Sequence, residues 1–162
     1  MNIIKIGHSD AARVAPLVAD FRVTLNSFKG ICSEPDVASG KEEIDEFLEA
    51  GSPVYAVEDE NTLCGYMVCR IEGPCVWVEH IFVADSFRRR GAGSLLFGKA
   101  EELAASFGGD TVFNYVHPNN DRMIAFLRSK GYTVLNLIEI RKPYEGETPS
   151  TTINVGNNVF DY

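Results

Sequence analysis

The chain of 162 residues is long enough for one domain with a sizeable core. Its hydrophobic fraction of 45% and charged fraction of 23% are those of an ordinary globular protein, and no apolar run is long enough to cross a bilayer, so we expect no membrane partner. The 23 acidic residues outnumber the 15 basic ones, and the net charge of −8 argues against a nucleic-acid partner and is compatible with a cationic substrate.

Cysteine and histidine usage argues against a metal site. The three histidines and four cysteines do not cluster at ligand spacings, and no Cys-x-x-Cys pair occurs. The N-terminal stretch, Met1 to Lys5, lacks the charged and apolar regions of a secretory signal. We therefore expect a cytoplasmic protein whose thiols serve as small core residues: Cys32, Cys64, Cys69 and Cys75.

The first fifty residues predict a short strand followed by two helices. Ile3 to Ile6 has the composition of a strand. Ser39 with Glu42 has the spacing of a capping box for the second helix, which Gly51 ends. The first helix is predicted from apolar residues at helical spacing, namely Val14, Leu17, Val18, Phe21 and Leu25.

The middle of the chain predicts three consecutive strands rich in Val, Ile, Tyr, Trp and Phe. They are expected at Val54 to Val57, Leu63 to Ile71 and Cys75 to Val83. The turns between them are short, and a parallel return needs a longer crossover, so these strands must be antiparallel.

The second half alternates helices and strands. A helix is predicted after Gly91, and a strand at Thr111 to Val116 then completes a parallel βαβ crossover. Asn119 or Asn120 caps a further helix, and Tyr132 to Ile140 is predicted as the next strand.

The element order predicts a mixed α/β (α+β) fold, with a mostly antiparallel sheet and one parallel crossover. We expect one domain over residues 1–144 and a C-terminal tail over 145–162 that forms a hairpin or an edge strand. Such a strand could pair with a second copy of the chain, which predicts a homodimer.

The segment between the third of these strands and the next helix has the pattern of an anion site. Glycines open the helix, and its free N–H groups and dipole favour a phosphate there. The sequence lacks the Gly-Lys-Ser/Thr of a P-loop and the third glycine of the dinucleotide fingerprint. The residues concerned are Arg88, Arg89, Arg90, Gly91, Ala92, Gly93 and Ser94.

These residues resemble the acetyl-CoA motif of the GNAT superfamily of N-acetyltransferases. That motif is Gln/Arg-x-x-Gly-x-Gly/Ala, which Arg88-x-x-Gly91-x-Gly93 matches in full. Residues 77–83 are similar to the family's fourth strand, and 120–132 are similar to its second motif, an Asn-capped helix that ends in Gly-Phe/Tyr. The resemblance implies a three-layer fold in which two central strands splay apart, and it implies acetyl-CoA as cosubstrate.

The resemblance also implies how the cofactor would lie. The backbone of Ile81, Phe82 and Val83 would pair with pantetheine like an added strand. The amides from Arg89 to Ser94 would hold the pyrophosphate, and Asn120 would contact the cofactor from the second motif. The implied reaction is direct attack of a primary amine on acetyl-CoA in a ternary complex; the alternative is a regulatory module that binds acetyl-CoA without catalysis.

The catalytic residues implied are Glu79 and His117. An alkylammonium with a pKa of roughly 10 must lose a proton, and Glu79 stands where relatives often carry their base. His80 neighbours Glu79 and faces the opposite side in a regular strand, unless a bulge alters this. Relatives often place a proton-donating Tyr where this chain has Leu127. The thiolate then leaves unprotonated or takes a proton from one of Tyr115, His117 or Tyr132.

Overall fold

The computed structural model describes all residues, 1–162. It contains two compact units, Met1–Ile124 and Ala125–Tyr162, which are described separately below. The expected boundary between a domain at 1–144 and a tail at 145–162 stays a prediction. None of the helices combines the length and the apolar composition that crossing a bilayer requires.

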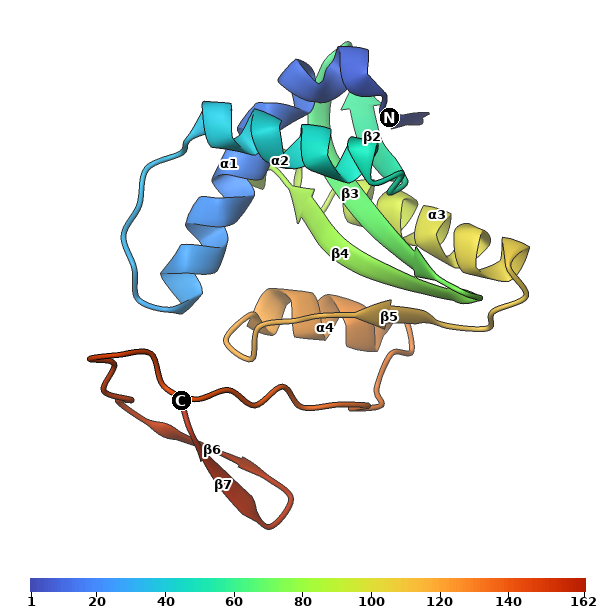
Figure 1. The fold of residues 1–162 in the computed structure, drawn as a ribbon. Helices are drawn as coiled ribbons and strands as arrows, with labels where there is room; N and C mark the ends of the chain where they lie inside the picture. The colour runs from blue at the N-terminus through green and yellow to red at the C-terminus, as the bar shows by residue number, and fades with distance from the viewer. The chain divides into compact units, whose positions relative to one another are not determined.

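The first unit is built on a five-stranded sheet in the order β1-β2-β3-β4-β5 (Figure 1). The first four strands pair antiparallel, and β5 pairs parallel to β4. The predicted mixed sheet with one parallel crossover is therefore confirmed. The strands are β1 (Asn2–Lys5), β2 (Val54–Asp59), β3 (Thr62–Glu72), β4 (Cys75–Val83) and β5 (Val112–Asn114).

Helices cover both faces of this sheet and give the three layers. Helices α1 (Ala11–Phe28) and α2 (Val37–Glu49) lie on one face, and α3 (Ala92–Ser106) lies on the other (Figure 1). Helix α4 (Asp121–Ser129) follows β5 and contains the division between the two units.

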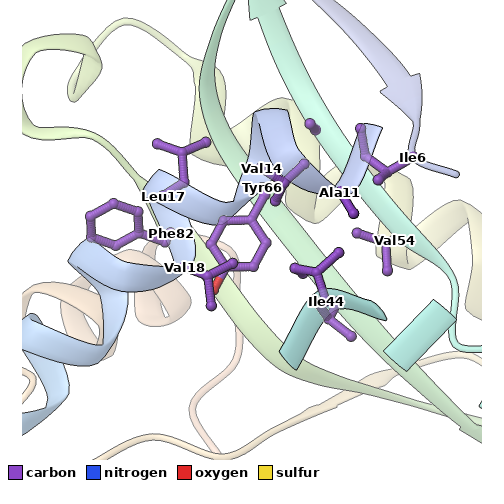
Figure 2. Close-up of a cluster of buried hydrophobic side chains, with 11 residues drawn as sticks. Ile6, Ala11, Val14, Leu17, Val18, Ile44, Val54, Tyr66 and Phe82 are labelled. Atoms are coloured by element: carbon purple, nitrogen blue, oxygen red, sulfur yellow. The ribbon is translucent and has the colours of Figure 1, made fainter. Parts of the chain in front are cut away.

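The core on the α1/α2 face explains why these helices pack there (Figure 2). Apolar residues of α1 at helical spacing meet the alternate residues of β2, β3 and β4 that point to this face. Burial of such side chains contributes about 1.5–3 kcal/mol each, an upper estimate. The cluster is Ile6, Ala11, Val14, Leu17, Val18, Ile44, Val54, Ala56, Tyr66, Val68 and Phe82.

Helix α2 begins earlier than the predicted capping box places it. Asp36 is the capping residue, and its Oδ1 accepts a hydrogen bond from the backbone N–H of Ser39 at 3.0 Å. Ser39 thus occupies the third helical position instead of the cap. The difference arises because a carboxylate three residues earlier reaches the same free N–H groups, and these bonds lower the pKa of Asp36.

The predicted strand at Tyr132–Ile140 is wrong, since this segment has no regular secondary structure. A strand needs hydrogen bonds from a partner, which the residue pattern does not supply by itself. The only strands of the second unit are β6 (Thr152–Val155) and β7 (Asn158–Asp161). They form an antiparallel hairpin whose turn contains Gly156 at φ 60°.

Candidate active site

The turn between β4 and α3 has the geometry of an anion site. Helix α3 starts at Ala92, and Gly91 precedes it with φ 96°, a conformation that favours glycine. No side chain caps this end of the helix, so its first N–H groups remain available to a ligand. Arg89 also has a positive φ of 62°, a conformation that is uncommon for a non-glycine residue.

The structure separates Arg88 from the other two arginines. The Nε atom of Arg88 donates to the carbonyl oxygen of Val83 at 2.9 Å, and Nη1 pairs with Asp85 at 2.5 Å. The guanidinium also lies over the Phe82 ring, 5.6 Å from its centre. Arg88 therefore joins the end of β4 to the turn from within the protein.

Arg89 and Arg90 are both exposed, but their surroundings differ. Arg90 contacts Asp59 at 3.4 Å and the Phe87 ring at 5.3 Å. Arg89 has no protein partner. Among the three predicted arginines, Arg89 is thus the guanidinium that is free for a phosphate.

Strands β4 and β5 pair over only three positions. Val76, Trp77 and Val78 face Val112, Phe113 and Asn114 in the ladder, and there the pairing stops. From Glu79 onward β4 has no partner on its β5 side. The expected splay is confirmed, and Ile81–Val83 lies along its open edge, as predicted for a strand that pairs with an extended ligand.

A bulge interrupts β4 at Glu79. Val68 of β3 pairs with His80, whereas the next residue, Cys69, pairs with Val78, so Glu79 is the extra residue. Val68 belongs to the core on the α1/α2 face, and Cys69 therefore points to the α3 face. Val78 and His80 consequently face opposite sides of the sheet, although they are two positions apart.

The Glu79 carboxylate is held by a guanidinium. Arg70 Nε donates to Glu79 Oε1 at 2.5 Å, and Arg70 also pairs with Glu72. These carboxylates raise the pKa of Arg70, most strongly through the hydrogen bond from Glu79. Arg70 lies two residues after Val68 on β3, so both side chains point to the same face. Glu79 contacts Arg70, and His80 pairs with Val68, so Glu79 and His80 lie on the same side of the sheet. Of the two expectations for His80, the alternative with a bulge therefore applies, and the one for a regular strand does not.

His80 is buried, with 6% of its surface exposed, at a meeting point of three elements. Its Nδ1 lies 3.2 Å from the Tyr66 hydroxyl and its Nε2 lies 3.3 Å from Glu43 Oε1 of α2. The rings of Phe21 and Phe47 pack on it at 4.7 and 5.0 Å. Burial lowers the pKa of His80 to about 4, so the ring is neutral at pH 7.

His117 and Asn120 lie in the loop after β5. The His117 ring stacks on Phe28 at the end of α1, 5.6 Å between centres, and burial lowers its pKa. Asn120 Oδ1 accepts from the backbone N–H of Met123 at 3.1 Å, so Asn120 is the residue that caps α4. Its side-chain oxygen is therefore used within the protein.

Asn114, where β4 and β5 separate, is a residue that the sequence analysis did not assign to the site. Asn114 is the last residue of β5, and its Oδ1 is buried without a protein partner. An apolar-rich strand pattern gives no sign of this, because the burial of one amide oxygen depends on the tertiary fold.

The sequence matches the model of the Acetyltransferase (GNAT) family over residues 21–132, which is most of the chain. The chain belongs to the GNAT acetyltransferase family. The matched region contains the turn, the splayed strands and the capped α4. GNAT proteins use acetyl-CoA, and the uncapped helix start beside a free arginine fits the phosphates of that molecule.

Several solved structures share this fold. A mutant of the BH1408 protein from Bacillus halodurans matches with TM-score 0.73 at 21% identity, covering 89% of this chain and 99% of that one. AAC(6')-Iy in complex with the bisubstrate analog CoA-S-monomethyl-acetylneamine matches with TM-score 0.67 at 18% identity, covering 88% and 98%. The PaiA N-acetyltransferase of Thermoplasma acidophilum in complex with coenzyme A matches with TM-score 0.66 at 18% identity, covering 80% and 87%. No curated protein sequence matches the chain significantly.

Proposed function

We propose that this protein transfers the acetyl group of acetyl-CoA to a primary amine by direct attack in a ternary complex. The observation that carries the proposal is the uncapped start of α3 at the end of a strand whose β5-side edge is open. An anion site that adjoins an exposed strand edge suits a molecule in which an extended amide chain follows a pyrophosphate.

The cofactor residues follow from this arrangement. Backbone groups of Ile81–Val83 pair with the pantetheine chain, and the amides from Arg89 to Ser94 hold the pyrophosphate. The Arg89 side chain adds a charge-assisted bond, while Arg88 keeps the strand and the turn in register through Val83. Asn120 contributes through its amide nitrogen, because its oxygen caps α4.

Glu79 is the proposed base. Its Oε1 is bonded to Arg70, which leaves Oε2 to take a proton from the incoming ammonium, directly or through water. The free amine then attacks the thioester carbonyl, a new C–N bond forms, and the C–S bond breaks. A backbone N–H of β4 near Phe82 or Val83 stabilises the developing oxyanion.

Leu127 cannot protonate the leaving sulfur of CoA, because its side chain has no proton donor. A thiol is acidic enough to leave as a thiolate, since the pKa of an ordinary cysteine thiol is about 8.5. His117 and Tyr115 are the donors that the first unit offers, and both follow β5 directly. His117 is the proposed one, because its stacking on Phe28 fixes the position of its ring.

A second candidate function is a regulatory module that binds acetyl-CoA without catalysis. The ion pair of Glu79 with Arg70 and the missing donor at Leu127 favour it. Calorimetric binding of acetyl-CoA without thiol release for any amine would support this alternative, and turnover would exclude it.

The decisive experiment incubates the protein with acetyl-CoA and a panel of small amines and peptides and follows thiol release. Glu72 supplies a matched control, because it pairs with the same arginine as Glu79 but lies at the end of β3. We expect Glu79→Gln to lower kcat by about 100-fold or more, as loss of a general base does. Glu72→Gln should stay within about twofold of the wild type. Equal effects of the two variants would remove Glu79 from the mechanism.

We also propose that the C-terminal hairpin pairs with a second copy of the chain. The hairpin has only two strands, which is marginal for a sheet on its own, and Val159 on β7 is 65% exposed. A dimeric mass in light scattering that becomes monomeric on deletion of residues 145–162 would support this proposal. A monomeric mass for the full chain would exclude it.

A further inference from the structure

We infer that Asn114 binds a ligand N–H at the closed end of the opening between β4 and β5, and that the donor is an amide of the pantetheine chain. The inference rests on the proposed function, since it uses acetyl-CoA as the occupant of the opening. It adds a residue to the site that neither the motif nor the family resemblance names.

The orientation of the Asn114 amide is fixed by the protein. Its Nδ2 donates to the carbonyl oxygen of Val112 at 3.1 Å. If the amide were flipped, its oxygen would lie 3.1 Å from the Val112 carbonyl oxygen, and two acceptors cannot form a hydrogen bond. The atom beside Val112 is therefore the nitrogen. Oδ1 is therefore the acceptor that is buried with no protein partner.

A buried acceptor without a partner is destabilising. Its desolvation typically costs about 1–3 kcal/mol, which is why most such groups in proteins are hydrogen-bonded. Among the side chains of this protein, Asn114 Oδ1 is the one buried nitrogen or oxygen atom without a partner. An apolar residue of similar size would avoid the penalty, so the amide is explained best by a partner that arrives with a ligand.

The place of Asn114 in the sheet identifies the ligand. Asn114 faces Val78 in the last pair of the β4–β5 ladder, and the bulge at Glu79 follows at once. A chain that lies along Ile81–Val83 and extends toward Glu79 ends beside this pair. Pantetheine carries amide N–H groups along its length, which are donors suited to a neutral carbonyl acceptor.

The inference predicts that one substitution weakens binding without a matching loss of stability. Asn114→Leu removes the unpaired oxygen and also the hydrogen bond from Nδ2 to Val112, and these two effects on stability oppose each other. The melting temperature of the free protein should therefore stay within about 4 °C of the wild-type value. The same change should weaken acetyl-CoA binding by about tenfold in calorimetry and raise its KM to match. The KM of the amine should stay within about twofold, and a rise in that KM instead would assign the donor to the acceptor substrate and overturn the inference.

A truncated ligand separates this inference from the proposed function. Adenosine 3′-phosphate 5′-diphosphate has the nucleotide and pyrophosphate of CoA but no pantetheine, so Asn114→Leu should leave its affinity unchanged. Gly91→Ala, which strains the turn, should weaken both ligands. If the wild-type protein does not bind acetyl-CoA, the proposed function fails.

Two results overturn the inference alone. In the first, the wild type binds acetyl-CoA and Asn114→Leu binds it equally well. In the second, Asn114→Leu weakens the binding of adenosine 3′-phosphate 5′-diphosphate as much as that of acetyl-CoA, which means that the lost affinity does not arise at the pantetheine chain. Should Asn114→Leu not fold, Asn114→Ala tests the same difference between acetyl-CoA and its truncated form.

Discussion

Gly65 is the position at which a single methyl group should test the link between packing and cofactor binding. It lies on β3 and faces Val83, the last residue of β4. A Cβ atom at Gly65 would meet the carbonyl oxygen of Phe82 at 2.7 Å and Val83 Cγ2 at 3.1 Å. The first contact is with backbone, which cannot rotate away, so β4 itself must shift in Gly65→Ala.

The expected loss follows from two opposing effects. Overpacking of this kind typically costs about 1–3 kcal/mol. Replacing glycine by alanine inside a strand returns about 0.5–1 kcal/mol of backbone entropy. The net destabilisation of Gly65→Ala is therefore about 1–2 kcal/mol, which corresponds to a fall in melting temperature of about 2–8 °C for a protein of this size. Because the shifted backbone is that of Phe82 and Val83, the KM for acetyl-CoA should rise severalfold.

Thermal unfolding by calorimetry and steady-state kinetics test this prediction. Gly98→Ala is the matched control, because Gly98 lies inside α3 and a Cβ there meets nothing within 4 Å. This control should raise the melting temperature by about 2–4 °C and leave the KM unchanged. The reasoning is refuted if Gly65→Ala melts no lower than the wild type, or if it melts lower while the KM for acetyl-CoA does not change.

Two further predictions concern pH and capping. In the folded protein the pKa of His80 is about 4, below its usual 6.5. The neutral, buried ring therefore contributes its full stability above pH 6.5. This contribution to the unfolding free energy is lost as the pH falls toward 4, by as much as about 3 kcal/mol. Urea midpoints at pH 4.5 and 7.5 should therefore differ less in His80→Gln than in the wild type, and equal differences would show that burial does not suppress protonation of this ring. Asp36→Ala should cost about 0.5–2 kcal/mol of unfolding free energy because α2 loses its cap, whereas Glu34→Ala, an exposed neighbour before the helix, should change it by less than 0.5 kcal/mol.

The sequence predicted most of the sheet because alternation and turn residues are local signals. The three central strands were found to within two residues, as was the crossover that makes β5 parallel to β4. The predicted strand at Tyr132–Ile140 failed for the opposite reason: whether an apolar segment becomes a strand depends on a partner elsewhere in the chain.

The site was only partly predictable. The turn at Arg88–Gly93 is a local motif, and Gly91 directly precedes helix α3, as the motif predicts. The bulge at Glu79 is not visible in the pattern, because buried and less buried residues alternate without interruption from Cys75 to Val83 while the strand changes face. The pairing of Glu79 with Arg70 and the unpaired oxygen of Asn114 depend on neighbouring strands, which no local pattern reports.

The bulge at Glu79 divides β4 into two segments, which pair with different strands. Before Glu79 the strand is held on both sides, by β3 and by β5; after it, β3 is the only strand that holds it. A substitution in the first segment affects the pairing with both β3 and β5. A substitution in the second segment affects the pairing with β3 alone. A substitution after Glu79 should therefore alter the site with a smaller effect on the rest of the sheet than a substitution before it.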